Sequence, residues 1–238
     1  MIITTPKALP VTIHNRPISA SIAVLSFNQP YLVKEMHRQL GSHIVIIDNG
    51  SNPPIVDADV FVPENRYFSG GWNYAMPFLE GEWVAMLNDD ITGISLPMIY
   101  DLIDTAERSG YAAISPAFNS PHAHMQPQGT GLRPVASIDW VAAIIRKDAW
   151  NAVGGFNEAF KGYGSDLELS FKLMKKGCRL AVDDRHVIHH IGGAAAVAGG
   201  TQHIQGNVTA MNEAFQREYG ASDWIDFTNR FLLEVFNG

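Results

Sequence analysis

Two adjacent carboxylates follow an apolar run that predicts a buried strand. The run covers residues 83–87, and Asn88, Asp89 and Asp90 come directly after it. Ligands of open α/β sheets bind at the carboxyl ends of the strands, so the pair has a position suited to binding. Adjacent carboxylates repel each other unless a cation or hydrogen-bond donors offset their charge, and a divalent ion with oxygen ligands meets that need. The spacing alone leaves two interpretations open, a metal site and an ordinary turn after a strand.

Two further segments combine turn residues with groups that could bind a nucleotide. Asp48 ends the apolar run 43–48 and opens an Asp-Asn-Gly-Ser turn. Its carboxylate can accept hydrogen bonds from a ribose or a base edge, or it can serve the turn alone. Gly70 and Gly71 open a segment of helical spacing, residues 69–79, where backbone N–H groups could approach a phosphate. Glycines are equally typical of close packing, so both interpretations stay open.

A carboxylate and a pair of histidines lie in the second half of the chain. Ser165 and Glu168 match the capping-box pattern, which predicts a helix that starts at Asp166. From a helix start the Asp166 side chain can project into a cleft as a general base, or it can simply complement the helix dipole. His189 and His190 point to opposite faces if they lie on a strand, so at most one of them joins a given site.

Alternating apolar runs and helical periodicities predict the elements that hold these groups. Runs rich in Ile and Val predict strands over residues 21–27, 43–48, 58–62, 83–87, 112–115 and 138–145. Helical spacing and capping signals predict helices over residues 30–40, 69–79 and 95–108, from 166 onward, and over 205–219 and 223–236. This alternation predicts an α/β fold with a mostly parallel central sheet flanked by helices. Residues 119–134 are expected to form a loop or irregular hairpin, and the glycine-rich residues 192–203 a mobile loop that could act as a lid.

Composition sets the remaining bounds. With 238 residues, 46% of them hydrophobic, the chain can bury one core, and we expect a single domain over 1–238, with an extended arm at 1–18 and closing helices in 205–238. One cysteine allows no internal disulfide, and the sequence has neither a spanning apolar run nor a secretory signal, so the expected location is cytoplasmic. A net charge of −7 argues against nucleic acid as a partner. An acidic protein that binds a diphosphate needs a bound cation or helix N-termini.

Taken in order, the motifs of residues 21–193 resemble those of family 2 glycosyltransferases with the GT-A fold, especially their rhamnosyltransferase-like branch. The matching pieces are residues 26–28, 48–51, 65–73, 87–90 and 154–158, together with Asp166 and His190. Residues 87–90 look like that family's Asp-x-Asp variant. The resemblance implies a single GT-A (nucleotide-diphospho-sugar transferase) domain that moves a sugar from a UDP-, dTDP- or GDP-sugar to an acceptor hydroxyl with inversion of configuration.

The resemblance also implies roles for individual residues. Asp90 would bind Mn²⁺ or Mg²⁺, His190 would complete the metal site, and Asp166 would be the base that deprotonates the acceptor hydroxyl. Asp48 would contact the nucleoside, and Asn88 or Asp89 would lie near the ribose and diphosphate. The other positions implied in donor binding are Asn28, Asn65, Gly70, Gly71 and Asn73, with Trp72 and Trp140 either as walls of the sugar or acceptor pocket or as core residues.

Two positions depart from the family pattern, which has Glu where this chain has Ser165 and Arg where it has Lys172. Ser is a good N-cap and would leave Asp166 at the helix start, but Lys does not reproduce a planar bidentate contact. Two alternatives stand beside sugar transfer. A nucleotidyltransferase would share a metal site at the sheet edge but normally uses a basic Gly-rich loop, which this sequence lacks. A catalytically silent nucleotide-sugar-binding protein of the same fold would bind the donor without turnover.

Overall fold

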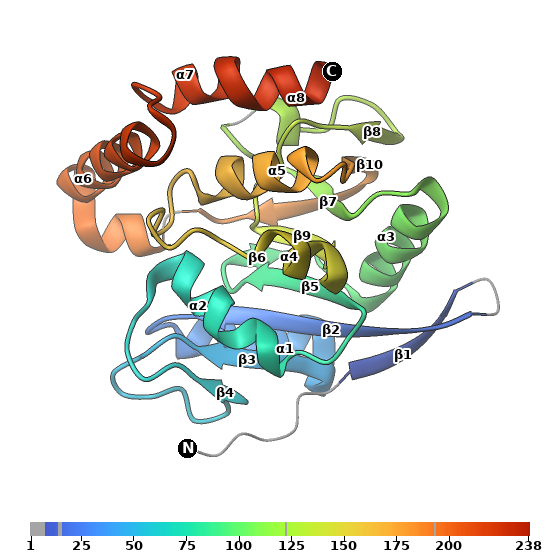
Figure 1. Ribbon diagram of the computed structural model, residues 1–238. Coiled ribbons are helices and arrows are strands. Elements are labelled where there is room, and N and C mark those ends of the chain that lie inside the picture. The colour runs from blue at the N-terminus through green and yellow to red at the C-terminus, as the bar shows by residue number, and fades with distance from the viewer. Residues whose placement is uncertain (1–7, 14–15, 122, 193) are drawn as a thin grey trace.

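The computed structural model describes residues 8–13, 16–121, 123–192 and 194–238, and a ten-stranded mixed sheet lies at its centre (Figure 1). The main path of the sheet is β4-β3-β2-β5-β9-β7-β10-β6, with β1 paired to β2 and β8 to β10. The strands are β1 (Ala8–Ile13), β2 (Arg16–Ser26), β3 (Ile44–Asp48), β4 (Val60–Phe61), β5 (Trp83–Asn88), β6 (Ile91–Thr92), β7 (Ala113–Phe118), β8 (Leu132–Pro134), β9 (Ala142–Arg146) and β10 (Leu180–His190). The helices are α1 (Pro30–Leu40), α2 (Tyr67–Ala75), α3 (Leu96–Ser109), α4 (Lys147–Val153), α5 (Ser165–Lys175), α6 (Ala194–Tyr219), α7 (Trp224–Phe227) and α8 (Leu233–Asn237), with short turns η1 (Gly41–His43), η2 (Met76–Phe78), η3 (Ala123–Met125) and η4 (Thr228–Leu232).

Six strands run in the same direction, β2, β3, β4, β5, β7 and β10, which brings their carboxyl ends to one edge of the sheet. β2 pairs in parallel with β3 and β5, and β7 pairs in parallel with β10. β9 lies between β5 and β7 and is antiparallel to both, so β5 and β7 share one direction. The carboxyl ends of these six strands therefore lie at the same edge as the amino end of β9. Ligands of open α/β sheets bind at such an edge.

The local signals that predicted α1 and α3 are confirmed. α1 begins at Pro30, where the missing N–H is not needed for the helix. Ser95 caps α3, because its Oγ accepts the backbone N–H of Met98 at 3.4 Å, and Gly110 ends the helix in the left-handed region with φ of 69°. The α/β architecture is likewise confirmed, although the sheet is mixed because β9 is antiparallel to its neighbours.

Two local predictions are wrong. The glycine-rich residues expected to form a mobile loop belong instead to α6, which begins at Ala194, while residue 193 lies outside the described residues. Alanine has the highest helix propensity, so the opening alanines of α6 favour helix although each glycine costs about 1 kcal/mol relative to Ala. The capping box also fails. Gly164 is the N-cap of α5, and Ser165 Oγ donates to the Gly162 carbonyl at 2.5 Å instead of capping the helix.

The regions expected to be irregular hold short elements. Segment 119–134 contains η3 and β8, and β8 pairs antiparallel with β10. Of the arm expected at residues 1–18, the described part forms β1 and the start of β2, which pair antiparallel. Residues 1–7 and 14–15 of that arm lie outside the described residues. The strand predicted to start at residue 138 starts at Ala142, so residues 138–141 form an entry segment to β9.

The C-terminal helices, α6 at the left of Figure 1 and α7 and α8 at its top, pack on α5 through an aromatic cluster. Phe215 of α6 stacks on Phe227 of α7 with ring centroids 4.4 Å apart, and Phe171 of α5 meets Phe227 edge to face at 5.4 Å. Tyr219 of α6 donates its hydroxyl hydrogen bond to Glu168 Oε1 at 2.7 Å. Since Phe215 and Phe227 are fully buried, these contacts hold α6 and α7 against α5.

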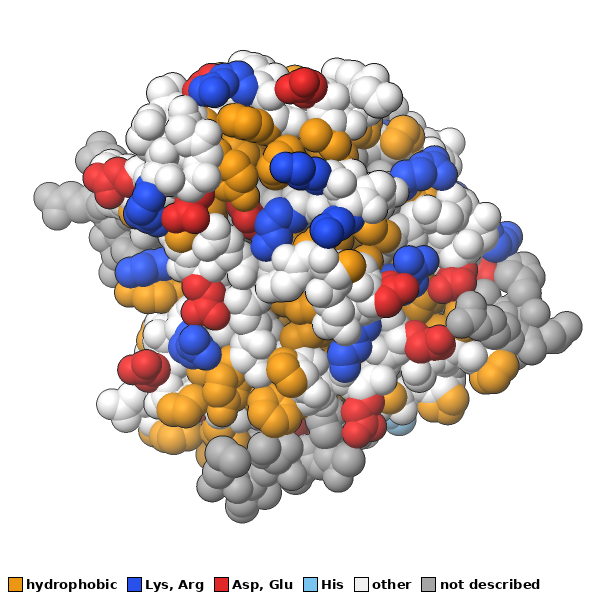
Figure 2. Space-filling model, in the orientation of Figure 1, with side chains coloured by type: hydrophobic (Ala, Val, Ile, Leu, Met, Phe, Trp, Pro, Cys, Tyr) orange, Lys and Arg blue, Asp and Glu red, His pale blue; other side chains and the backbone are white. Residues whose placement is uncertain are grey.

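The surface drawn in Figure 2 mixes charges of both signs. Among the described side chains on this face, Lys and Arg are interspersed with Asp and Glu and do not gather in one patch. This face therefore presents no continuous positive track of the kind that binds a nucleic-acid backbone. None of the helices formed by described residues combines the length and the apolar character needed to cross a bilayer.

Candidate active site

Asp90 and His190 meet at the carboxyl edge of the sheet. Asp90 Oδ1 and His190 Nε2 are 3.2 Å apart, and both side chains are mostly buried. Asn119, which follows β7, holds the His190 backbone: its Oδ1 accepts the His190 N–H at 2.8 Å, and its Nδ2 donates to the His190 carbonyl at 3.2 Å. The Ile191 N–H donates to the Asp90 carbonyl at 2.9 Å. The fold thus brings together the two residues that the sequence indicated as metal ligands.

Asp89 lies beside this pair in a desolvated position. Burial raises the pKa of Asp89 to about 7; the hydrogen bond from Ser26 opposes the shift, and the neighbouring charge of Asp90 adds to it. Ser26 ends β2, and its Oγ donates to Asp89 Oδ2 at 2.6 Å. A cation at this edge would stabilise the ionised form of Asp89, because it would offset the repulsion between the adjacent carboxylates.

Asp166 reaches the same site through a residue that the sequence interpretation missed. Asp166 is half-buried in the first turn of α5, and its carboxyl is hydrogen-bonded to that of Asp139 in the entry segment of β9. Asp139 also interacts electrostatically with His190. A signal for Asp139 did exist, since it is a carboxylate within the apolar run 138–145. Only the antiparallel direction of β9 places it at the carboxyl edge.

Asp48 and Asn28 order the turn after β3. Asp48 is 2% exposed, and its two carboxylate oxygens accept the N–H groups of Ser51 at 2.9 Å and Ile55 at 3.0 Å. Asn28 Oδ1 accepts the Asn52 N–H at 2.8 Å. Each side chain therefore stabilises the turn after β3 through hydrogen bonds to its backbone. The nucleoside contact of Asp48 stays a prediction.

The other donor-binding positions on and before α2 take part in packing. Asn49 Nδ2 donates to Asn65 Oδ1 at 3.3 Å, and a Cβ added to Gly71 would lie 3.0 Å from the Asn49 side chain. Asn73 Nδ2 donates to the Phe156 carbonyl at 2.9 Å, and Asn73 Oδ1 accepts the Phe156 N–H at 2.9 Å. These contacts join α2 to the turn after β3 and to the segment after α4. A role in donor binding stays a prediction for them and for Gly70.

Trp72 and Trp140 lie in the interior rather than on an open wall. Trp72 is 0% exposed and Trp140 is 2% exposed. Trp140 packs edge to face on Phe156, with ring centroids 6.0 Å apart, and Trp72 packs on Phe68 at 6.4 Å. Neither indole N–H has a hydrogen-bond partner among the described residues. The geometry favours the core interpretation, and a wall of the sugar pocket stays a prediction.

Lys172 braces α5 from inside the fold. Its Nζ donates to the Gly155 carbonyl at 2.6 Å and lies 3.6 Å from Glu168 Oε2. Gly155 belongs to the segment after α4 that also bonds to α2, so the lysine connects α5 to that segment. The lysine thus makes a one-point contact to a carbonyl, which does not require the planar group of an arginine.

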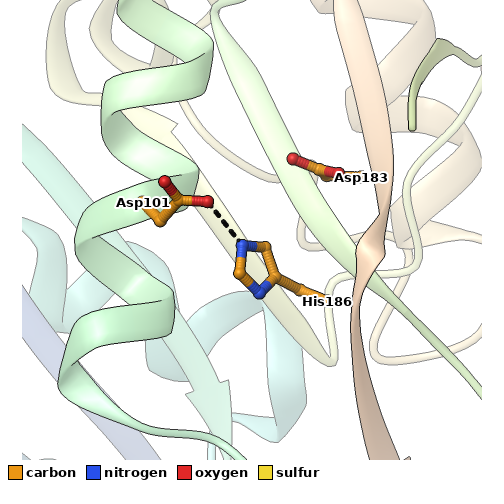
Figure 3. A group of neighbouring side chains, drawn as sticks. All are labelled: Asp101, Asp183 and His186. Atoms are coloured by element: carbon orange, nitrogen blue, oxygen red, sulfur yellow. Dashed lines mark hydrogen bonds and ion pairs between the residues drawn. The ribbon is translucent and has the colours of Figure 1, made fainter. Parts of the chain in front are cut away.

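A second group of possible metal ligands lies away from this edge. Asp101 of α3 and Asp183 and His186 of β10 have ligand atoms within 4.8 Å of one another (Figure 3). His186 Nε2 lies 2.6 Å from Asp101 Oδ2. Arg185 Nε is 2.9 Å from Asp183 Oδ1, so a cation already faces that carboxylate. This acidic triad could hold a metal ion, but an ion would have to compete with the guanidinium.

The fold and this edge together define a class: the chain has the GT-A fold of glycosyltransferases. It is similar to the structure of GalNAc-T7 with UDP, GalNAc and Mn²⁺, with a TM-score of 0.60 and 9% identity over 92% of this chain and 57% of that one. It is also similar to the mannosyltransferase PcManGT from Pyrobaculum calidifontis in complex with GDP-Man and Mn²⁺, with a TM-score of 0.60 and 14% identity over 91% of this chain and 68% of that one. S. aureus TarS (1–349) shares a TM-score of 0.53 and 13% identity over 89% of this chain and 74% of that one. The expected resemblance to GT-A glycosyltransferases is therefore confirmed at the level of the fold.

Relatives found by sequence are more similar to the chain in identity than these structures are. An uncharacterised protein of Mycobacterium tuberculosis is 26% identical over 207 residues, which is 79% of either chain. The O-antigen biosynthesis protein RfbC of Myxococcus xanthus is 24% identical over 147 residues, which is 50% of this chain and 12% of that protein. No protein-family model matches the chain.

Proposed function

We propose that this protein is a metal-dependent, inverting glycosyltransferase that moves a sugar from a nucleotide-diphosphate sugar to an acceptor hydroxyl. The observation that carries the proposal is the meeting of Asp90, His190 and the Asp139–Asp166 pair at the carboxyl edge of a GT-A sheet. The UDP and GDP-Man in the neighbouring structures support a nucleotide-sugar donor, and the RfbC relative supports a rhamnosyltransferase-like branch.

The ligand set at the edge fits a divalent ion. Asp90 would supply a carboxylate oxygen and His190 an imidazole nitrogen, while the desolvated Asp89 adds negative charge beside them. Carboxylates are ligands of both Mn²⁺ and Mg²⁺, whereas imidazole is a ligand of transition ions, so the set favours Mn²⁺. When bound, the ion would supply positive charge to the departing diphosphate.

Asp166 is the proposed base. Its carboxylate would accept the proton of the acceptor hydroxyl while that oxygen forms a bond to the anomeric carbon of the donor. The bond from the anomeric carbon to the diphosphate breaks in the same step, and its electron pair leaves with the nucleoside diphosphate. A single displacement of this kind inverts the anomeric configuration.

The test is Asp166→Asn, assayed against wild type with Mn²⁺, a panel of UDP-, dTDP- and GDP-sugars and a panel of acceptors. Transfer should fall by about 10²- to 10⁴-fold. Nucleotide binding measured by calorimetry with Mn²⁺ should change little, because Asp166 faces the acceptor. Full activity in the variant would refute the assigned base. Released nucleoside diphosphate supports sugar transfer, released pyrophosphate indicates a nucleotidyltransferase, and binding without any turnover indicates a silent binding protein.

A second set of variants tests the metal site at the sheet edge. Asp90→Asn and His190→Ala should each weaken Mn²⁺-dependent nucleotide binding by roughly tenfold or more. Asp101→Asn, in the acidic triad of Figure 3, is the matched control and should leave that binding unchanged. If Asp101→Asn abolishes Mn²⁺ dependence while Asp90→Asn does not, the metal belongs to the triad and the assignment at the sheet edge is wrong.

A further inference from the structure

Asp139 connects Asp166 to the rigid part of the sheet. It is 9% exposed, and Ser120, just beyond β7, donates its Oγ–H to Asp139 Oδ2 at 3.1 Å. Its other oxygen, Oδ1, lies 4.0 Å from His124 Nε2 of η3. His124 Nε2 is in turn 3.2 Å from Ser137 Oγ. The Asp139 side chain therefore has partners just after β7, in η3 and in α5.

A hydrogen bond between two carboxyl groups constrains both of them. Two adjacent ionised carboxylates repel each other, so a hydrogen bond between two carboxyl groups requires that they share a proton. Asp166 lies in the first turn of the 11-residue helix α5, where the helix dipole favours the anion. Asp139 is the more buried of the two and also accepts a hydrogen bond from Ser120, so its side chain is the one held by the surrounding fold. The shared proton holds the Asp166 carboxyl against Asp139 whichever of the two groups carries it.

We propose that Asp139 is a positioning residue: its carboxyl shares a hydrogen bond with that of Asp166 and, through Ser120, ties the Asp166 side chain to the segment just after β7. This inference rests on the proposed function, because it gives Asp139 a role in orienting the base. Asp166 itself lies at the end of a helix whose N-cap is a glycine without a side-chain bond to the helix. The bond to Asp139 therefore supplies a restraint on the Asp166 carboxyl that the local helix geometry does not.

The variants Asp139→Asn and Asp139→Ala test this role. The amide of Asp139→Asn can accept from Ser120 through its oxygen and donate to Asp166 through its nitrogen, so it keeps both bonds. We expect kcat within about threefold of wild type for Asp139→Asn, because the base keeps its orientation. Asp139→Ala loses both bonds, and kcat should fall by roughly 10- to 100-fold, as a displaced catalytic group can cost about 10²-fold. KM for the donor should change less than about twofold in both, since Asp139 acts through the acceptor base.

Other outcomes overturn the proposal. An equal loss of kcat in the Asn and Ala variants would mean that the ionisable carboxyl of Asp139 is itself required. An unchanged kcat in Asp139→Ala would mean that no positioning takes place. Ser120→Ala, which removes the bond from Ser120 to Asp139, serves if Asp139→Ala does not fold. It should lower kcat by a few-fold at unchanged donor KM, and wild-type kcat in this variant would also count against the role.

Crystal structures of the variants separate this inference from the proposed function. In Asp139→Ala the Asp166 carboxyl should leave its wild-type rotamer or lose order, and in Asp139→Asn it should stay in place. An unmoved Asp166 in Asp139→Ala rejects the positioning role whatever the activity. A wild-type protein that transfers no sugar from any donor rejects the proposed function, and the rotamer comparison still decides the role of Asp139.

Discussion

Replacing Lys172 with Met should destabilise the protein in a pH-dependent manner. The Glu168 side chain is 1% exposed, and Lys172 Nζ lies 3.6 Å from its Oε2. Without the lysine, Glu168 keeps the hydrogen bond from Tyr219 at 2.7 Å and a hydrogen bond from the backbone of Asn157, and the Gly155 carbonyl loses its donor at 2.6 Å. Removing one partner of a buried ion pair typically costs about 3–5 kcal/mol.

We take the lower end of that range, about 3 kcal/mol at about pH 8, because Tyr219 still stabilises the carboxylate. For a chain of this size the loss corresponds to a fall of roughly 6–12 °C in the unfolding midpoint, at ~2–4 °C per kcal/mol. Lys172→Met retains the length of the apolar stem, so the charge and the donor are what the substitution removes.

The pKa of Glu168 determines how the loss of stability depends on pH. Burial raises the pKa of Glu168 above its usual value, and the charge of Lys172 opposes that shift. A folded-state pKa above the unfolded one means that the folded protein binds the proton more tightly, so the stability is present at low pH and is lost as pH rises through the folded pKa. Without Lys172 the pKa rises further. The cost of the substitution should therefore be smaller at about pH 5 than at about pH 8.

The free energy of unfolding is measured at both pH values by urea denaturation, with circular dichroism as the probe. Lys176→Met replaces an exposed lysine just after α5 and is the matched control, expected within about 0.5 kcal/mol of wild type. Adding Glu168→Gln to Lys172→Met should recover most of the loss, because the buried charge is then gone. If Lys172→Met lowers the free energy of unfolding by less than about 1 kcal/mol, and equally at both pH values, the proposed role of Lys172 in stabilising the buried Glu168 carboxylate is wrong.

Three further outcomes follow from the same geometry. Ser26→Ala should raise the pKa of Asp89 further, by about one unit, because the Ser26 hydrogen bond opposes the upward shift. A ¹³C NMR titration of the carboxyl carbons measures this pKa, and an unchanged or lower value contradicts the prediction. Mn²⁺ affinity should rise from about pH 6 to about pH 8, because the ion competes with a proton at Asp89, and a flat calorimetric profile would exclude that competition. Gly155→Ala should lower the free energy of unfolding by about 1–3 kcal/mol, because Gly155 has a φ of 71° and the added Cβ would lie 2.6 Å from Asn73 Oδ1. An unchanged midpoint of urea unfolding would show that the segment relaxes around the new side chain.

Local chemistry determined several features without help from the fold. Ser95 predicted the start of α3, since its hydroxyl acts on backbone groups within a few residues, and the helical pattern of residues 30–40 predicted α1. The place of Asp90 directly after a buried strand likewise came from the order of residues alone. The capping box failed at the same local level, because two residues competed for one N-cap. Gly164 is the N-cap residue, and the hydroxyl of Ser165 donates a hydrogen bond to the Gly162 carbonyl instead.

Tertiary structure alone decided which distant groups share the site. The sequence by itself determined that Asp89, Asp90, Asp166 and His190 are of types suited to metal binding and proton transfer, and their order carried the resemblance. It could not place Asp139 among them, because that depends on β9 running antiparallel between β5 and β7. Strand direction is set by pairing between segments far apart in the chain, which no local pattern encodes. The partners of these carboxyl groups, and with them their protonation, belong to the folded protein.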